Sequence, residues 1–296
     1  MNSSLGRKSK ATVSSKLFPF TVLAGAAALA TAAVLCMSTA AFPDNTAPRP
    51  HLVVTPALLT PDVTAQPDDP AWRSAAATQQ FTLSLGNESK GQAPLPTTAK
   101  VLWDKNYLYI RFICNATEIY APYRKHDADL YKGDVVEVFL DAKGDGRQWI
   151  ELEVSPYGST MDQLATLTAD PVSDSNLIVI SDVLNRDWWV DLSWSLDGWR
   201  TAASIQKSGG KVTGWTVDMA LPASSILHRL GQTAFTPMTL RANLLRYEEV
   251  PSPGSPNGRR MTSINWSPVV FGCPHISPLA MGYLELDESS GQTSQK

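Results

Sequence analysis

The sequence predicts an all-β fold, an antiparallel β-sandwich of the jelly-roll or immunoglobulin-like type with one short helix. Three observations predict it: an alternating run at 134–141, a Gly-Asp-Gly turn leading to a second alternating run at 149–154, and many short strand-like segments between turns. The chain has 296 residues, of which 43% are hydrophobic and 18% charged. That length and composition suffice for one large core, and no internal repeat divides the region.

The two alternating runs predict a hairpin with two different faces, because strand side chains change face at every residue. One face is apolar, and it carries Val136, Val138, Leu140, Ile150, Leu152 and Val154. The other carries carboxylates and rings, namely Glu137, Phe139, Asp141, Trp149, Glu151 and Glu153. Two interpretations of this second face follow: a solvated exterior of the sheet, or the floor of a binding site.

Further strands are expected along the chain. The run 107–114 alternates cleanly, with Leu108, Ile110, Phe112 and Cys114 inward and Tyr107, Tyr109 and Arg111 largely outward. Other expected strands are 80–85, 100–103, 177–180, 189–195, 214–220, 239–247 and 281–286. The one predicted helix follows Leu221-Pro222, runs over 223–230 and ends at Gly231. Residues 157–176 are expected to be a loop or a poorly patterned segment, and 249–262 a long loop near the site.

The N-terminal 42 residues are predicted to be a targeting segment. A basic start is followed by an apolar, Ala-rich run at 17–42, as in a signal peptide or an uncleaved signal anchor. The Pro-rich stretch 43–61 is expected to be a linker, assigned to 43–55, or a first extended segment. The β-sandwich is expected at 56–288 and a disordered tail at 289–296. The protein is then exported, periplasmic or extracellular, with membrane attachment only through an uncleaved N-terminal segment. In that oxidising compartment Cys114 and Cys273 could pair, or Cys114 could be a buried thiol.

Charge and motifs exclude several function classes. The net charge of −3 argues against a nucleic-acid partner, because phosphate neutralisation needs clustered Lys and Arg. The sequence contains no Gly-x-Ser-x-Gly elbow, His-Glu-x-x-His motif or phosphate loop. Two alternatives stay open: a glycan-processing enzyme that uses Glu137 with Glu151 or Glu153, and a haem-binding redox domain. The axial ligands in the second case would come from Met161, Met219 or His275.

Several motifs between about Asp62 and Leu286 resemble the carbohydrate-binding module family 9, and its single-domain "family 9-like" relatives in particular. The stretch Val101-Leu102-Trp103-Asp104-Lys105-Asn106-Tyr107-Leu108-Tyr109 is the most specific match, and 131–141 resembles the family's "aromatic-x-x-Asp-x-Val-Glu-hydrophobic-Phe" strand. The opening Asp69-Pro70-Ala71-Trp72 and the closing segments 266–268, 275–278 and 281–284 resemble the family pattern too.

The resemblance implies non-catalytic binding of a carbohydrate, either a glycan end or a small saccharide, as in polysaccharide catabolism. In the sugar-binding members two rings sandwich a terminal sugar and a Glu on the central strand bonds its hydroxyls. Tyr131 and His275 stand at the ring positions and Glu137 at the Glu position, whereas Glu153 aligns near a position that is basic in those members. The strand 241–246 resembles the "Arg-x-Asn…Arg" of the family 9-like relatives. The expected ligand-binding residues are therefore Tyr131, Glu137, Arg241, Asn243, Trp266 and His275.

Two arginines and several acids have alternative interpretations. Arg241 and Arg246 could read hydroxyl or carboxylate groups of a ligand, or pair with Glu137, Glu151 or Glu153 across the sheet. Asp127, Asp129 and Asp134 could hold calcium, because this ion takes hard oxygen ligands in irregular loops, or could be the acids of an ordinary solvated turn. A second candidate for calcium is the turn that holds Asp141 and Asp145.

Overall fold

The structure is a computed structural model that describes residues 49–84, 95–167, 188–255, 258–269, 274–276 and 278–289. Every described residue belongs to one compact unit, which spans 45–296. The predicted targeting segment at 1–42 therefore lies outside the described residues. Among the helices that are described, none combines the length and the apolar character that crossing a membrane requires.

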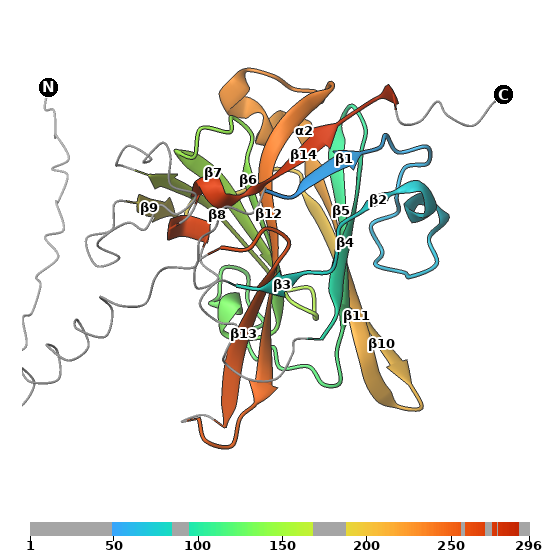
Figure 1. Ribbon diagram of the computed structural model, residues 1–296, viewed down its shortest axis with the longest axis vertical. Helices are drawn as coiled ribbons and strands as arrows, with labels where there is room; N and C mark the ends of the chain where they lie inside the picture. The colour runs from blue at the N-terminus through green and yellow to red at the C-terminus, as the bar shows by residue number, and fades with distance from the viewer. Residues whose placement is uncertain are drawn as a thin grey trace, which may run out of the picture. The chain divides into compact units, whose positions relative to one another are not determined.

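Two sheets make up the described fold, which confirms the predicted all-β sandwich (Figure 1). The larger sheet has the strand order β1-β14-β12-β6-β7-β8-β9, and β13 pairs with both β12 and β3. Its strands are β1 (His51–Val54), β3 (Thr82–Leu83), β6 (Val135–Asp141), β7 (Gln148–Val154), β8 (Thr160–Leu167), β9 (Trp188–Asp191), β12 (Met238–Pro251), β13 (Arg259–Asn265) and β14 (Gly282–Leu286). All of these pairings are antiparallel except that of β1 with β14.

The smaller sheet has the order β10-β11-β5-β4-β2 and is antiparallel throughout. Its strands are β2 (Ala76–Ala77), β4 (Thr97–Trp103), β5 (Tyr107–Asn115), β10 (Arg200–Ser208) and β11 (Lys211–Pro222). Short helical turns lie between strands: η1 (Pro70–Ser74), η2 (Leu130–Lys132), α2 (Ala223–Ile226), η3 (His228–Leu230), η4 (Pro274–Ile276) and η5 (Pro278–Ala280).

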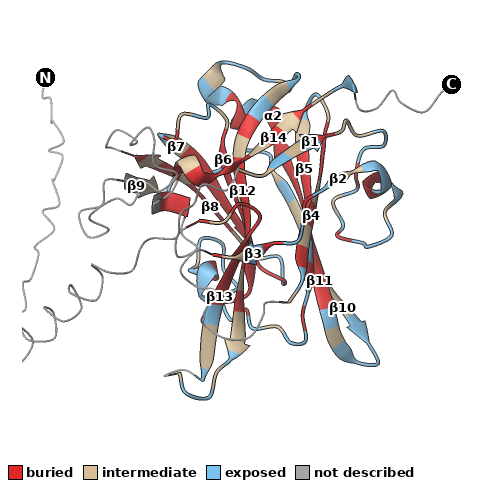
Figure 2. Ribbon diagram, viewed as in Figure 1, coloured by how far each residue is buried: buried red, intermediate tan, exposed pale blue. Residues whose placement is uncertain are grey.

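The main core lies between the two sheets, where buried residues of both meet (Figure 2). Val136, Val138 and Leu140 of β6 face it from one side, and Leu108, Ile110, Phe112 and Cys114 of β5 face it from the other. These are the inward positions that the alternation predicts. Cys114 is a buried free thiol, and burial raises its pKa to about 12; Cys273 lies outside the described residues.

The outer face of the large sheet is not a solvated exterior. Phe139, Trp149, Leu245 and Met281 form a second buried cluster there, and Glu137, Glu151 and Glu153 are buried on the same face. Segments that return across the sheet, including η4 and η5, contribute to this cover. The polar residues of this face therefore lie inside the protein, where their hydrogen bonds and charges weigh more than in water.

The predicted helix is present and ends where expected. Ala223–Ile226 is α-helical and continues into η3, and Gly231 closes the segment with the left-handed φ of 66° that glycine adopts without strain. The leading Pro222 supplies the extended backbone before the first turn.

Several expectations about individual segments were wrong. β8 occupies most of the first half of 157–176, and β12 with β13 forms a long hairpin where a loop over 249–262 was expected. β10 was not predicted at all. β1 lies within 43–61, where the sequence left a linker and a first extended segment as alternatives. β8, β10 and the outer part of the β12–β13 hairpin pair with strands that are adjacent in the chain, but their polar residues interrupt the apolar alternation. The short β1 pairs with the distant β14. The strand expected at 177–180 lies outside the described residues.

An ion pair links the middle strands of the small sheet on its outer face. Arg111 of β5 stands directly opposite Asp218 of β11, and its Nε and Nη2 donate to the two carboxylate oxygens at 2.7 and 2.8 Å. Asp218 also accepts from the backbone N–H of Ala65, and the guanidinium lies 4.7 Å from the ring centroid of Trp72. Both charged groups are buried, so the segment 62–74 is fixed over this sheet by a bidentate, charge-assisted pair.

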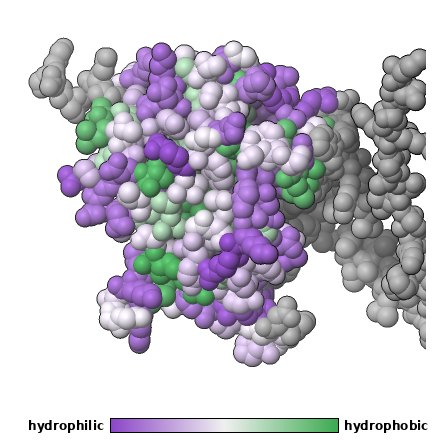
Figure 3. Space-filling view, turned by 180° about the vertical axis from the view of Figure 1, so that it is seen from behind, coloured by the Kyte–Doolittle hydropathy of each residue, from purple (hydrophilic) through white to green (hydrophobic). Residues whose placement is uncertain are grey.

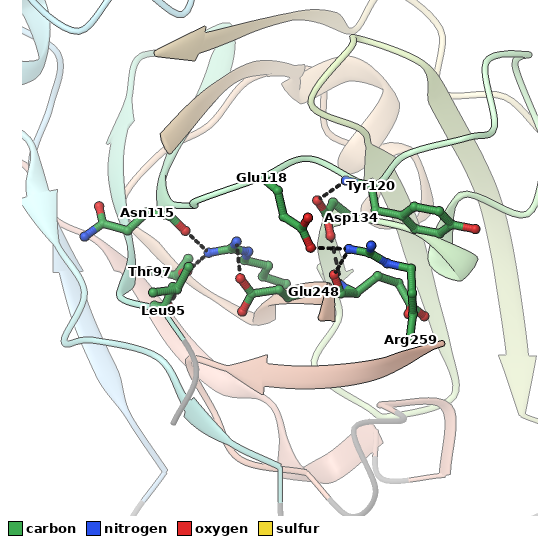
Figure 4. Close-up of polar contacts among 10 residues, drawn as sticks. Leu95, Thr97, Asn115, Glu118, Tyr120, Asp134, Glu248 and Arg259 are labelled. Carbon is green, nitrogen blue, oxygen red and sulfur yellow. Dashed lines mark hydrogen bonds and ion pairs between the residues drawn. The ribbon is translucent and has the colours of Figure 1, made fainter. Parts of the chain in front are cut away.

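A second buried arginine lies between the sheets. Arg246 of β12 donates through Nη1 to the hydroxyl of Thr97 and the carbonyl oxygen of Asn115, and through Nη2 to Glu248. Figure 4 shows Thr97, Asn115 and Glu248 converging from separate segments at this point. Since the side chain is fully buried, these bonds replace the water that a guanidinium otherwise holds.

Candidate functional site

Three carboxylates meet on the outer face of the large sheet. Glu137 of β6 is directly opposite Glu153 of β7, and Glu151 lies two residues away on the same face. One carboxylate oxygen from each lies within 4.8 Å of the others, and the residues are only 1 to 5% exposed. We call Glu137, Glu151 and Glu153 the outer-face carboxylate cluster. The alternation in the sequence predicts their shared face but not their burial.

His275 joins this cluster through a chain of hydrogen bonds. The indole Nε1 of Trp149 donates to Nδ1 of His275 at 3.1 Å, and Nε2 of His275 lies 2.9 Å from Glu151. With Nδ1 accepting, the ring carries its proton on Nε2 and donates it to the carboxylate. Gln163 donates to the same oxygen of Glu151, and the ring of Phe139 meets His275 edge to face at 5.2 Å. The imidazole thus contacts three side chains on the sheet face, those of Trp149, Glu151 and Phe139.

Tyr131 lies at the margin of the cluster. It belongs to η2, its side chain is 41% exposed, and its backbone N–H bonds Glu153. The ammonium of Lys132 lies 5.5 Å from its ring centroid. Tyr131 is thus joined to the cluster through its backbone while the residue itself is exposed. An exposed aromatic ring can stack on the apolar face of a ligand, and carboxylates can accept hydrogen bonds from its hydroxyl groups.

Burial and a neighbouring negative charge both act on the carboxyl group of Glu153. Burial, followed by the charge of Glu151, raises the pKa of this carboxyl group well above its usual value. The sugar-binding pattern has a basic residue near this position, and a glutamate there leaves the cluster strongly acidic. A protonated Glu153 can donate a hydrogen bond, whereas an ionised one only accepts.

Arg241 does not pair with the cluster in its described contacts. Its Nη1 donates to the carbonyl oxygen of Leu279 at 2.9 Å and its Nη2 to the hydroxyl of Tyr283 at 2.7 Å. Arg246 bonds Glu248. The described hydrogen bonds of these two arginines therefore do not include the ion pairs with Glu151 or Glu153 that were one alternative. Arg241 instead fixes η5 and β14 against β12.

Asn243 and Trp266 have structural contacts. The amide of Asn243 donates to the carbonyl oxygen of Ser267 and accepts from the backbone N–H groups of Leu244 and Ser267. Asn243 is fully buried, so its ligand-reading groups are engaged within the protein. Trp266 belongs to the main core and lies where a Cβ on Gly282 would come within 2.8 Å of its ring. The sequence motif is present, but its role here is to close the fold.

Each of the acids that could hold calcium has different partners in the structure. Asp134 is buried and accepts from the backbone N–H groups of Tyr120 and Glu249, while Asp129 pairs with Lys132. Asp127 lies instead beside His126 and Asp162. Asp141, in the second candidate, accepts from Lys143, Gly144 and Gly146 and so shapes the β6–β7 turn.

The two methionines considered as haem ligands lie in different clusters of buried residues. Met219 is fully buried in the core between the sheets. Met161 packs with Leu130 and Val135 in a small cluster beside η2. These positions give both methionines packing roles.

The fold and these contacts define a β-sandwich domain with an acidic and aromatic outer sheet face. The chain matches the model of the family described as "Carbohydrate family 9 binding domain-like" over residues 64–243, and it belongs to that family. The resemblance inferred from the sequence motifs is thereby confirmed.

Individual relatives agree with this assignment. The chain is 23% identical over 229 residues to exoglucanase XynX of Acetivibrio thermocellus, which covers 77% of this chain but only 17% of that enzyme. A protein from Bacteroides uniformis proposed to bind carbohydrate superposes with a TM-score of 0.56 at 13% identity, covering 81% of this chain and all of the other. A family 9 module from Caldicellulosiruptor kristjanssonii in complex with cellotriose gives 0.53 at 13% identity, covering 83% and 98%. At this identity the solved structures show the fold alone.

Buried carboxyl groups predict that the protein is most stable at mildly acidic pH. Burial raises the pKa of Asp134 to about 6 and raises those of Asp141, Glu153 and Glu249. The folded state then binds more protons than the unfolded state below these values, so stability rises as pH falls. From pH 7.5 to 5.5 Asp134 alone contributes about 1 kcal/mol, or an increase in Tm of about 2 to 4 °C.

Thermal unfolding followed by circular dichroism across this pH range checks the prediction. Asp134→Asn should flatten the rise, whereas Asp191→Asn, at an exposed acid with a lowered pKa, should not. Below about pH 4 stability should fall again, because Asp145, Asp191 and Asp287 have pKa values below the usual range and lose their bonds on protonation. A Tm that is flat or falling between pH 7.5 and 5.5 contradicts the assignment.

Proposed function

We propose that this protein is an exported, non-catalytic module that binds carbohydrate on the outer face of its large sheet. One observation carries the proposal: the exposed residue Tyr131 bonds Glu153 of the outer-face carboxylate cluster through its backbone N–H, in a chain of the carbohydrate family 9 binding domain-like family. Family 9 modules of the same fold are solved with cellotriose and with glucose. Stacking on a ring and hydrogen bonds to carboxylates are sufficient for recognition without chemistry.

Each residue has a defined role in this proposal. The Tyr131 ring stacks on the apolar face of a terminal sugar, and Glu137 with Glu151 accepts hydrogen bonds from its hydroxyls. His275 is the second ring, oriented by Trp149 and Phe139. Export follows from the basic and apolar segment at 1–42, and it places the module where polysaccharides are found.

Replacement of Tyr131 by alanine is expected to weaken carbohydrate binding at least about tenfold, because loss of one stacking partner costs on the order of 1.4 kcal/mol. A glycan array identifies a ligand, and isothermal titration of that ligand measures the change. Tyr107→Ala, on β5 of the other sheet, is the matched control and should bind as the unaltered protein does. Equal affinity for both variants and the parent would reject this site.

The enzyme alternative has a separate test. The carboxylates of the cluster lie close enough together for the geometry of a retaining glycosidase, in which the two groups are about 5 to 5.5 Å apart. We expect no turnover on the glycans that bind. Release of reducing sugar that is abolished by Glu137→Gln would replace the binding function with hydrolysis.

A further inference from the structure

A histidine and two aspartates converge at one end of β8, on the side of the strand opposite the outer-face carboxylate cluster. His126 and Asp127 come from the irregular segment before η2, and Asp162 lies on β8 opposite Leu152, whose side chain faces the main core. Nε2 of His126 lies 3.3 Å from Oδ2 of Asp127 and 3.6 Å from Oδ1 of Asp162. We call these three residues the His126 cluster.

The contacts of His126 orient its ring so that Nε2 faces the aspartates. Nδ1 lies 3.1 Å from the carbonyl oxygen of Thr160 and 3.1 Å from its hydroxyl group. The carbonyl oxygen can only accept, and donation to it by Nδ1 is the arrangement that frees the lone pair of Nε2 for a metal ion. Nε2 and the two carboxylate oxygens then repel one another unless a proton or a metal ion lies between them. A backbone carbonyl that fixes the remote nitrogen is also the usual orientation of a metal-binding histidine.

The buried aspartate supplies an independent observation. Asp162 is 1% exposed, and its Oδ2 accepts from the backbone N–H of Leu196. Its Oδ1 is buried and accepts no hydrogen bond from the described residues, although it is directed at Nε2 of His126. A buried carboxylate oxygen without a donor costs free energy that a bound cation would recover.

The distances favour one class of cation. Around a tetrahedral ion with bonds of about 2.0 to 2.2 Å, ligand atoms lie roughly 3.4 Å apart, close to the 3.3 and 3.6 Å observed. Calcium prefers six to eight oxygen ligands, whereas one imidazole with two carboxylates suits zinc and similar first-row ions. The side chain of His126 is 55% exposed, so an ion reaches the cluster from solvent and keeps water at its remaining positions.

We propose that His126, Asp127 and Asp162 form a binding site for a divalent transition-metal ion, with zinc as the probe. The ion would attach the segment 126–134, which carries Tyr131, to β8. This site is distinct from the calcium site expected at Asp127, Asp129 and Asp134, with which it shares one residue. The proposal does not depend on carbohydrate binding.

Isothermal titration of zinc chloride into the purified, metal-stripped full chain without a histidine tag tests the proposal. One ion per chain should bind saturably, and calcium at the same concentration should not displace it. His126→Ala and Asp127→Asn, both at exposed positions, should each weaken binding at least about tenfold. The control is His51→Ala. Nε2 of His51 also lies 2.7 Å from a carboxylate oxygen, that of Glu285. Among the described residues, however, His51 does not belong to a cluster of three possible metal ligands. His51→Ala should leave zinc binding unchanged.

Cobalt provides a spectroscopic measurement that does not depend on heats. Cobalt bound by imidazole and carboxylates should give visible absorption bands that His126→Ala abolishes and His51→Ala preserves. No saturable zinc binding, or binding unchanged in His126→Ala, overturns the proposal. Loss of binding in His275→Ala instead of His126→Ala also overturns it, since it would assign the ion to the outer-face carboxylate cluster.

Discussion

Replacement of Arg111 by alanine should lower the free energy of unfolding by about 3 to 5 kcal/mol, the range for breaking a buried ion pair. The substitution leaves the Asp218 carboxylate buried with only the backbone N–H of Ala65 as a described donor. It also removes the cation that lies over Trp72. Urea unfolding monitored by tryptophan fluorescence measures the loss.

A double replacement distinguishes the lost charge pair from lost packing. Arg111→Met combined with Asp218→Leu removes both charges, and it should recover much of the stability that either single change loses. Arg200→Ala is the matched control, because this exposed arginine of the same sheet also lies over a ring, that of Tyr107, at 5.0 Å. If Arg111→Ala costs no more than that control, the pair contributes little to the fold.

Replacement of Arg246 by methionine should cost a similar 3 to 5 kcal/mol. Methionine fills most of the volume, but Glu248 is left as a buried charge, and the carbonyl oxygen of Asn115 loses its guanidinium donor. Unfolding in guanidinium chloride measures the free energy of unfolding of three variants. These are Arg246→Met, the double replacement Arg246→Met with Glu248→Gln, and the exposed control Arg229→Ala. The second variant should be more stable than the first; the reverse order would contradict the account.

The polar contacts in Figure 4 explain why the effect of Arg246 should extend beyond its own neighbours. Glu118 pairs with Arg259 of β13, and Asp134 accepts from the backbone N–H of Tyr120. Together with Arg246 these contacts join the irregular segment after β5 to β12 and β13. Loss of Arg246 should therefore increase amide exchange in 116–134, the segment that carries Tyr131.

The surface seen from behind is consistent with a folded domain that meets water on this side. Figure 3 shows small hydrophobic patches separated by hydrophilic side chains on that face. Scattered apolar residues of this kind are ordinary on a monomeric surface.

The sequence predicts the central hairpin well, because its information is local. Val136, Val138 and Leu140 alternate with Glu137 and Phe139, and the turn residues follow directly, so the two faces and the register are encoded within twenty residues. The helix boundary at Gly231 is local in the same sense.

What the sequence does not predict depends on contacts between distant segments. β8 reads as a poorly patterned segment because Asp162 and Gln163 interrupt its apolar pattern, yet both are buried with partners from β7 and the segment around Leu196. Asn243 has the identity of a ligand reader, but Ser267, 24 residues later, engages its amide. The His126 cluster was also missed, since its members are 36 residues apart and the expected calcium ligands were chosen for their closeness in sequence.

The parallel pairing of β1 with β14 has a mechanical consequence. His51 lies opposite Tyr283 and Val54 opposite Leu286, so the two strands run in the same direction side by side. A pull applied to the chain before His51 and after Leu286 acts along both strands in opposite directions. Such tension loads their shared hydrogen bonds simultaneously instead of opening them one after another. The domain should therefore resist mechanical unfolding when its two ends are pulled apart.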